Sequence, residues 1–407
     1  MHVVALNLQR DWRGGEHQVL LLARELQGRG VRQTVVARRG SPLATRIAGL
    51  AGTAERAASD RDRIDADEEM GDPAERYGLA DGGRVPSRAA AAPAGGDISA
   101  DTFASSRSIP RVPIALLEAA NPLDAFARLP RRGAGEPLIY HAHTGNTVPV
   151  AVLAAGWRRR VVITRHLDRP VRPWLYRRAD HVVAVSPAVR DSLVAAGVAA
   201  ERIHVIPTAI DLRRRIDPAS VARLRAAWKI SAEGRVGLTV AAMSAEKDPL
   251  TLVRGLPHLP ADYRHVWVGD GPLRAEAAAL ARRLGVDDRL LLPGFDPEPE
   301  PWFGIASVFV LPSLWEAAGM AALDAFLFGV PVVASDVPGT RGLLDDGASC
   351  LRFPPGDDAA LAAAVERLGE DRELAGRLAG EGKGRLPAYD IRATAAMYLD
   401  LYRELGG

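Results

Sequence analysis

The chain of 407 residues has few means of reinforcing its fold, because its single cysteine, Cys350, can form neither an intramolecular disulfide nor a cysteine-rich zinc site. It also lacks a basic N-terminal segment followed by an apolar one, and no run approaches the roughly 18 apolar residues that cross a bilayer. A reducing compartment fits both absences. We expect a cytoplasmic protein that is at most peripheral to the inner face of a membrane.

The length and the distribution of charge bound the architecture and the partners. A single hydrophobic core seldom grows beyond about 250 to 300 residues, so a chain of 407 residues is expected to form two domains. The net charge of +2 is small, but arginines gather at residues 158–160, 169–178 and 213–215. These clusters could form a basic face that attracts an anionic glycolipid or a membrane surface. No nucleic-acid partner is expected.

Two sets of Val- and Ile-rich segments alternate with helical segments. The first set runs from "HVVALNL" to "ERIHVIPT", and the second runs from "RVGLTVAAMS" to "SCLRF". Strand and helix in alternation predict parallel strands with right-handed crossovers, so we expect an α/β protein with two Rossmann-like doubly wound domains that face a central cleft. The predicted division is a first domain at 1–207, a linker at 208–234, a second domain at 235–386 and a C-terminal helix at 387–407 that packs back on the first domain.

Residues 51–109 interrupt this alternation. They hold twelve acidic residues and seven arginines, are rich in Ala, Gly, Ser and Pro, and have almost no apolar periodicity. Such a segment cannot bury enough surface to offset the entropy of ordering, so it is predicted to be a mobile insertion. Asp65 and Asp67 form an Asp-x-Asp motif within it, but a metal site of that type needs a hydrophobic strand just before the acids, and none is present.

Small and basic residues follow the predicted strands of the first domain. Gly14 and Gly15 precede the first helix, where free N–H groups suit a phosphate, although a tight turn explains them equally well. Their spacing differs from G-x-G-x-x-G, which disfavours a hydride-transfer enzyme. His141 and His143 end the strand in "YHAHTGN", and we expect them to point to opposite faces, His141 toward the core and His143 toward the cleft. Arg165 ends "VVITRH" and could contact an anion.

The second domain offers a lysine and a pair of glycines after its first two strands. The chain has only three lysines among 52 basic residues, so Lys247 suggests a specific task, which would be to neutralise a diphosphate. Gly269 and Gly271, in "WVGDGPL", permit a close backbone approach, but a lone glycine pair is a weak signal.

The segment "SLWEAAGMAALDAF" carries two carboxylates around a predicted helix start. Glu316 lies in a loop, the helix begins near Gly319, and Asp324 lies within that helix. The N–H groups and the dipole of the helix would favour an anion, and each carboxylate can accept two hydrogen bonds from a vicinal diol of ribose or a hexose. Taken alone, the two acids are also compatible with a loop and a solvated helix.

In their order along the chain, these motifs resemble those of retaining glycosyltransferases of family 4, which have the two-lobed GT-B fold. The resemblance covers residues 1–50 and about 110–405. It is carried by the segments "RGGEHQVLLLARELQGRG", "YHAHTGN", "ADHVVAVSPAVRDSL", "IHVIPTAID", "EKDPLTLVRG", "VGDGPLRAE", "SLWEAAGMAALDAFLFGVPVVASDVPG" and "LRFPPGDDAALAAAV".

The resemblance implies an enzyme that needs no cofactor and no metal, with a nucleotide-diphosphate sugar, expected to be a UDP-sugar, as donor and a glycan or lipid-linked acceptor. Glu316 and Asp324 would occupy the E-x7-E positions that contact the sugar and the ribose. It implies catalytic roles for Glu316, His143 and Lys247, and donor-binding roles for Gly14, Gly15, Arg165, Gly269, Gly271, Gly319, Met320 and Asp324. His143 would face the donor sugar, and the role in cell-envelope polysaccharide or lipopolysaccharide synthesis is an expectation of the same kind.

Four positions depart from the family pattern. Asp324 stands where Glu is commoner, Ala242 replaces a diphosphate-binding Arg, Ala317 replaces the Gly after the first Glu, and Pro338 replaces one Gly of a "GG" pair. They leave two alternatives open. One is a non-catalytic sugar-nucleotide-binding protein, which would bind a donor without turnover. The other is a nucleotide-sugar 2-epimerase, which would form product without an acceptor.

Overall fold

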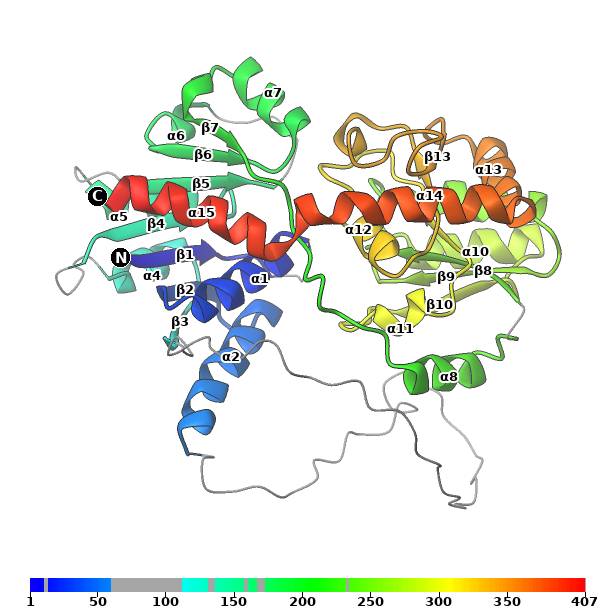
Figure 1. Ribbon diagram of the computed structural model, residues 1–407, viewed down its shortest axis with the longest axis horizontal. Helices are drawn as coiled ribbons and strands as arrows, with labels where there is room; N and C mark the ends of the chain where they lie inside the picture. Colours follow the sequence, from blue (N-terminus) through cyan, green and yellow to red (C-terminus); the bar gives the residue numbers. More distant parts are fainter. Residues whose placement is uncertain are drawn as a thin grey trace, which may run out of the picture.

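The structure is a computed structural model that describes residues 1–10, 14–59, 112–130, 136–156, 160–166, 173–231 and 234–406 (Figure 1). Most of the predicted insertion, with Asp65 and Asp67, lies outside the described residues. Most of the arginines at 158–160 and two of the four at 169–178 also lie outside them. Helix α2 continues to Ser59, past residue 51, where the predicted insertion starts. No helix within these described ranges is long and apolar enough to cross a membrane.

The first sheet has seven parallel strands in the order β3-β2-β1-β4-β5-β6-β7. Inner strands such as β1, β2 and β6 are buried on both faces, which explains their continuous apolar sequences. The elements of this part of the chain are β1 (His2–Asn7), α1 (Gly14–Gly28), β2 (Arg32–Arg38), α2 (Pro42–Ser59), β3 (Ile114–Ala119), α4 (Pro122–Arg128), β4 (Leu138–Ala142), α5 (Val148–Ala155), β5 (Val161–Arg165), α6 (Pro173–Tyr176), β6 (His181–Ala184), α7 (Pro187–Ala195), η3 (Ala200–Arg202) and β7 (Ile203–Val205).

The second sheet has six parallel strands in the order β10-β9-β8-β11-β12-β13. The first and last segments of the predicted second set, "RVGLTVAAMS" and "SCLRF", contain β8 and β13. The elements are α8 (Pro218–Ala227), β8 (Arg235–Val240), α9 (Pro249–Gly255), η4 (Leu256–His258), β9 (Tyr263–Val268), α10 (Arg274–Leu284), β10 (Leu290–Gly294), α11 (Glu300–Phe303), β11 (Val308–Leu311), α12 (Met320–Leu327), β12 (Val332–Ser335), η5 (Pro338–Thr340), β13 (Leu351–Phe353), α13 (Asp358–Glu370), α14 (Arg372–Arg385) and η6 (Leu386–Tyr389).

Both sheets reverse their strand order at one point, between β1 and β4 in the first sheet and between β8 and β11 in the second. Ligands of open parallel sheets bind beyond the carboxyl ends of the strands at such a switch point. In the first sheet this point lies near the start of α1 and the residues after β4. In the second it lies near the residues that follow β8 and β11. The topology alone therefore selects four short segments as candidates for a binding site.

The last helix, α15 (Ile391–Gly406), joins the first sheet rather than the second (Figure 1). Tyr398 and Tyr402 are buried in one apolar cluster with Val3 of β1 and Leu22 of α1. We call the first sheet with its helices and α15 the first lobe, and the second sheet with its helices the second lobe. The chain thus passes between the lobes twice, once before α8 and once after α14.

The two crossings lie side by side. Ile210 donates its N–H to the Tyr389 carbonyl at 2.9 Å, and Ile391 donates its N–H to the Ile210 carbonyl at 3.0 Å. The first crossing is also fixed to α1, because the Gln18 amide accepts from the N–H and donates to the carbonyl of Ala209, both at 2.7 Å. The connection between the lobes is therefore a pair of segments that are hydrogen-bonded to each other and held against the first lobe.

Candidate active site

The loop after β11 brings two of the predicted residues into direct contact. Lys247, from the turn after β8, makes an ion pair with Glu316 Oε1. Ser313 Oγ donates a second hydrogen bond to the same oxygen at 2.9 Å. The Glu316 side chain is 8% exposed, against 28% for Lys247, so the lysine is the more accessible of the two. A carboxylate and an ammonium group therefore lie together at the switch point of the second sheet.

Backbone contacts fix the loop that carries Glu316. Leu314 donates its N–H to the Glu246 carbonyl at 2.9 Å, which ties this loop to the turn of Lys247. A Cβ on Gly339 would lie 1.7 Å from the Glu316 carbonyl oxygen, so no side chain can be accommodated there without moving the loop. Gly339 is the glycine that remains beside Pro338, and its role in packing explains why a glycine is needed at this position.

The same loop contacts the first lobe. Ser186 Oγ, at the start of α7, donates to the Ala317 carbonyl at 3.0 Å. A Cβ on Gly14 would lie 3.0 Å from Met320 Cε, so the first residues of α1 and α12 lie next to each other. Gly319 begins α12 in a left-handed conformation with φ of 61°. Two helix N-termini with positive dipole ends thus meet near the Lys247–Glu316 pair, which is an arrangement suited to an anion.

On the first lobe, a group of histidines follows β4 and β5. His143 Nδ1 lies 3.4 Å from His166 Nε2, and the His166 ring is 3.7 Å from the Cβ position of Gly15. The expectation that His141 and His143 point to opposite faces is wrong, since their rings lie 3.9 Å apart. Side chains two residues apart in a strand point to the same face of the sheet, and only adjacent side chains point to opposite faces.

His141 is a core residue, as its side chain is fully buried. Its Nδ1 pairs with the Tyr402 hydroxyl at 2.6 Å and its Nε2 with Thr164 Oγ1 at 2.7 Å. Both ring nitrogens are thereby satisfied inside the protein. His141 consequently links β4 to α15 and supports the neighbouring His143.

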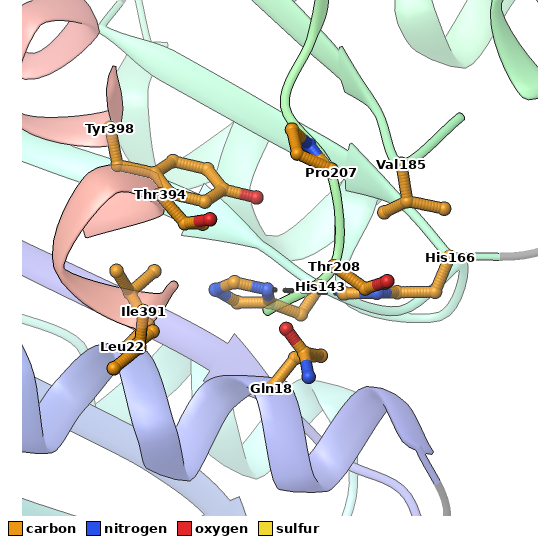
Figure 2. A pocket seen from close by; sticks show the side chains of 10 residues that line it. All are labelled: Gln18, Leu22, His143, His166, Val185, Pro207, Thr208, Ile391, Thr394 and Tyr398. Carbon is orange, nitrogen blue, oxygen red and sulfur yellow. Dashed lines mark hydrogen bonds between the residues drawn. The ribbon is translucent and has the colours of Figure 1, made fainter. Parts of the chain in front are cut away.

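The remaining nitrogen of His143 faces a small cavity between α1, α15 and the first crossing (Figure 2). His143 Nε2, Thr208 Oγ1 and Thr394 Oγ1 are buried there, and none has a hydrogen-bond partner among the residues that the structure describes. Gln18 and His166 also line this cavity. Buried polar groups of this kind normally pair with a ligand or an ordered water.

These histidines predict a pH dependence of stability. Burial lowers the pKa of His141 to about 3 and of His166 to about 4, and burial, with the neighbouring His141 and His166, lowers the pKa of His143 well below 6.5. Below pH 6.5 the unfolded chain therefore binds more protons at these positions than the folded chain does. The contribution of these histidines to the free energy of unfolding is complete above pH 6.5 and is lost as the pH falls toward 3 to 4. At pH 5 the free energy of unfolding is lower by about 2 kcal/mol per histidine.

We expect the unfolding midpoint to fall by several degrees between pH 7 and pH 5, as measured by circular dichroism. Other buried histidines lower the midpoint in the same direction, so the effect of one histidine is isolated with the variant His166→Asn. The midpoint of this variant should fall less between pH 7 and pH 5 than that of the wild type. Equal pH dependence in both proteins would contradict the assignment to this group.

Three other predicted residues have contacts within their own lobe. Arg165 hydrogen-bonds the Tyr176 side chain. A Cβ on Gly269, which has φ of 149°, would lie 1.9 Å from the Ala241 carbonyl oxygen, and a Cβ on Gly271 would lie 2.5 Å from that of Met243. The close approach that these glycines permit is therefore to the backbone after β8, which leads to Lys247.

Asp324 is paired with an arginine that the sequence did not single out. Arg214, from the first crossing, makes an ion pair with Asp324 Oδ1 and a second ion pair with Glu300 at 2.8 Å. Burial raises the pKa of Asp324, and Arg214 opposes that rise. The idea that arginines 213–215 form a basic face is therefore wrong for Arg214, which is 16% exposed and bound to two acids. The run of arginines at 213–215 was the signal in the sequence that could have pointed to Arg214.

Among the described residues, no group of three or more His, Cys, Asp or Glu side chains could hold a metal ion.

Two Rossmann-like lobes joined by paired crossings define the GT-B class of glycosyltransferases, and solved structures of that class match this chain. HepE of Anabaena, solved with UDP-glucose, aligns with a TM-score of 0.74 at 19% identity, covering 98% of this chain and 99% of that one. Sucrose-phosphate synthase of Thermosynechococcus elongatus aligns with a TM-score of 0.71 at 20% identity, covering 100% and 99%.

The chain belongs to glycosyltransferase family 4. Residues 12–214 match the model "Glycosyltransferase Family 4", and residues 220–385 match "Glycosyl transferases group 1". The lipopolysaccharide core biosynthesis glycosyltransferase LpsE of Rhizobium meliloti is 30% identical over 59% of this chain and 68% of that protein. Alpha-D-kanosaminyltransferase of Streptomyces kanamyceticus is 28% identical over 67% of this chain and 72% of that protein.

Proposed function

We propose that this glycosyltransferase moves a sugar from a nucleoside diphosphate sugar to a hydroxyl of a glycan or lipid-linked acceptor, with retention of the anomeric configuration and without a metal. One observation carries the proposal: the Lys247–Glu316 pair lies at the switch point of the second sheet, next to the start of α12, whose first residue Met320 lies against Gly14 at the start of α1. This arrangement offers cationic and dipolar groups to a diphosphate and a carboxylate to the sugar attached to it.

In the proposed reaction, the bond between the anomeric carbon and the leaving phosphate oxygen breaks. The acceptor oxygen forms its bond to the anomeric carbon on the same face, and its proton goes to a leaving phosphate oxygen. Lys247 and the N–H groups of α1 and α12 stabilise the charge that develops on the diphosphate. Glu316 accepts hydrogen bonds from the sugar hydroxyls, and Asp324 accepts them from the ribose.

On the first lobe, we assign the donor-sugar side of the site to the face formed by Gly15, His166 and His143. The His166 ring lies beside both of the others. Gly15 and His143 follow β1 and β4, the two strands of the switch point, and His166 follows the next strand, β5. Their low pKa values keep His143 and His166 neutral at physiological pH, so each ring can donate one hydrogen bond and accept one.

We propose a UDP-sugar as donor, supported by the solved complexes of HepE with UDP and with UDP-glucose. The relatives named for lipopolysaccharide core synthesis and for kanosaminyl transfer support an acceptor that carries sugar hydroxyls. A role at the cell envelope, a cytoplasmic location and peripheral contact with an anionic membrane stay predictions.

The experiment that tests the proposal is a thermal-shift screen of UDP-, GDP- and ADP-sugars against the purified protein, followed by assays of donor hydrolysis. A ligand that binds only the folded state raises the free energy of unfolding, by about 2.7 kcal/mol at a concentration of 100 times Kd, and thereby raises the unfolding temperature. We expect a UDP-sugar to give the largest shift and to be hydrolysed slowly without acceptor. Absence of any shift and of any hydrolysis across the panel would overturn the proposed function.

A second function, binding of a sugar nucleotide without catalysis, is favoured by Ala242 and Ala317, which replace an arginine and a glycine of the family pattern. Ala317 is buried, and its carbonyl accepts the hydrogen bond from Ser186, so this alanine is accommodated in the loop. A thermal shift with UDP-sugars combined with no hydrolysis and no transfer to any acceptor would establish the binding protein. Conversion of the donor to its 2-epimer without acceptor would establish the isomerase.

A further inference from the structure

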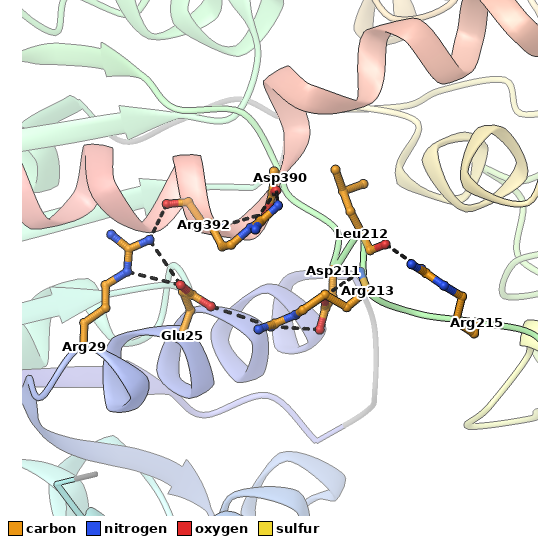
Figure 3. Close-up of polar contacts among 8 residues, drawn as sticks. All are labelled: Glu25, Arg29, Asp211, Leu212, Arg213, Arg215, Asp390 and Arg392. Carbon is orange, nitrogen blue, oxygen red and sulfur yellow. Dashed lines mark hydrogen bonds and ion pairs between the residues drawn. The ribbon is translucent and has the colours of Figure 1, made fainter. Parts of the chain in front are cut away.

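Two consecutive arginines of the first crossing bind to opposite lobes. Arg213 contacts Asp211 of its own segment at 2.7 Å and Glu25 of α1 at 3.7 Å, so it belongs to the first lobe (Figure 3). Arg214 pairs with Asp324 of α12 and Glu300 of α11, which belong to the second lobe. The division between the two lobes therefore passes through adjacent residues of the chain.

The second crossing is held against the first lobe at the same place. Arg29, just after α1, donates to the Arg392 carbonyl at 2.6 Å and pairs with Glu25 of α1 at 3.1 Å, and Arg392 in turn pairs with Asp390 (Figure 3). The backbone next to Arg214 is thus tied to α1 on both crossings. Its side chain extends from this anchored backbone into the second lobe.

The surroundings of the Arg214 guanidinium are specific. It is 16% exposed, and its central carbon lies 5.7 Å from the centre of the Phe328 ring. His17 of α1 faces it, since burial and then the Arg214 charge lower the pKa of that histidine to about 4. The charged and titratable groups that face Arg214 and Asp324 are therefore Glu300 on α11 and a neutral His17 on α1.

We infer that Arg214 is a positioning residue for the nucleotide: it fixes the Asp324 carboxylate so that the carboxylate accepts hydrogen bonds from the ribose hydroxyls of the donor. The inference rests on the proposed function, because it takes Asp324 to be the ribose contact. Arg214 binds one oxygen, Oδ1, and this leaves the lone pairs of the other oxygen for the diol.

Charge is the second reason for an arginine at this position. Burial raises the pKa of Asp324, and the nearby Glu300 raises it further, whereas Arg214 lowers it. Without Arg214, two acids would face each other in a partly buried site, and the fraction of Asp324 that is protonated would increase at neutral pH. A protonated carboxyl group accepts hydrogen bonds from a diol less well, so nucleotide affinity would become dependent on pH.

The test is the affinity of the full chain for UDP, measured by calorimetry at pH 7 and pH 9, for the wild type and the variants Arg214→Met, Arg214→Lys and Asp324→Asn. We expect Arg214→Met to weaken UDP about 10-fold to 100-fold at pH 7 and to recover in part at pH 9, as a charged interaction of this kind is worth about 1.5 to 3 kcal/mol. Arg214→Lys should restore part of the affinity, because it keeps the charge but cannot bind both acids in one plane.

Two comparisons separate positioning from a loss of structure. The double variant Arg214→Met/Asp324→Asn should bind UDP no worse than Asp324→Asn alone, because the two changes remove the same interaction. 2′,3′-Dideoxy-UDP, which lacks the diol, should bind the wild type and Arg214→Met equally. Arg215→Met is the matched control, since Arg215 is exposed and donates hydrogen bonds to the carbonyls of Leu212 and Arg214.

The outcomes are distinguishable. If the wild type binds no nucleoside diphosphate, the proposed function fails and the inference fails with it. If the wild type binds UDP but Arg214→Met binds it as tightly, or loses UDP and the dideoxy analogue to the same extent, the proposed function stands and the inference is overturned. Additive losses in the double variant would overturn it as well.

Discussion

Glu316→Gln is expected to abolish sugar transfer, with a loss of at least about 100-fold to 1,000-fold in kcat, the range found when one preorganised electrostatic group is removed from an active site. Glutamine keeps the shape and one acceptor oxygen but loses the negative charge. That charge faces the sugar, whose anomeric carbon becomes positive in the transition state. Binding of the donor should change little, because the diphosphate contacts remain. The measurement is transfer or slow hydrolysis of the donor that gives the largest thermal shift.

Two variants serve as controls for this result. Glu276→Gln removes an exposed carboxylate in the first turn of α10 and should leave turnover unchanged. Asp324→Glu keeps the charge at the ribose position and should be tolerated. Unchanged turnover in Glu316→Gln would contradict the assignment of Glu316 to the donor sugar. An equal loss of turnover in Glu276→Gln would contradict it as well.

Lys247→Met is expected to lower kcat/KM for the donor about 100-fold, which corresponds to about 2.7 kcal/mol. The lysine is the one side-chain cation that contacts Glu316 among the described residues, and it is the more exposed partner, so it can reach a diphosphate. Ala242 stands where many family members have a second cation, which increases the share that Lys247 must supply. The loss should appear in both KM and kcat, because the charge on the diphosphate grows as the bond breaks.

The control for this variant comes from the scarcity of lysine. Lys383→Met changes an exposed lysine in the last turn of α14, far along the chain from the site, and should leave the kinetics unchanged. Lys247→Met also leaves the Glu316 carboxylate with Ser313 as its remaining partner, so a modest fall in the unfolding midpoint is expected. Wild-type kinetics in Lys247→Met would exclude its role at the diphosphate.

Much of the fold could be predicted because local patterns determine it. Continuous runs such as "RQTVVAR" are buried on both faces, and their alternation with helical segments predicts parallel strands with right-handed crossovers. The start of α12 at Met320 was also predictable, because the glycine before it takes a left-handed conformation that other residues avoid. Lys247 and Glu316 could be predicted to lie close together, since each follows a strand at the same edge of a sheet.

Long-range contacts could not be predicted in the same way. The pairing of Arg214 with Asp324 joins residues 110 positions apart, and nothing in "LRRR" distinguishes the arginine that enters the second lobe from the two beside it. The pairing of His141 with Tyr402 likewise depends on how α15 packs on β4. The placement of His143 beside His141 is different, because strand geometry alone would have given it.

The sequence by itself therefore determined the two parallel sheets, the segments that follow their strands and the two loops that bear Lys247 and Glu316, because these features depend on neighbours close along the chain. The tertiary structure alone decided which lobe each side chain joins. Arg213 binds the first lobe and Arg214 the second, the loop of Glu316 is held by Ser186 and Gly339, and α15 returns to α1. The physical reason is that charge pairing and close packing depend on distances in space. These distances are fixed only when both lobes have folded and the two crossings of the chain connect them.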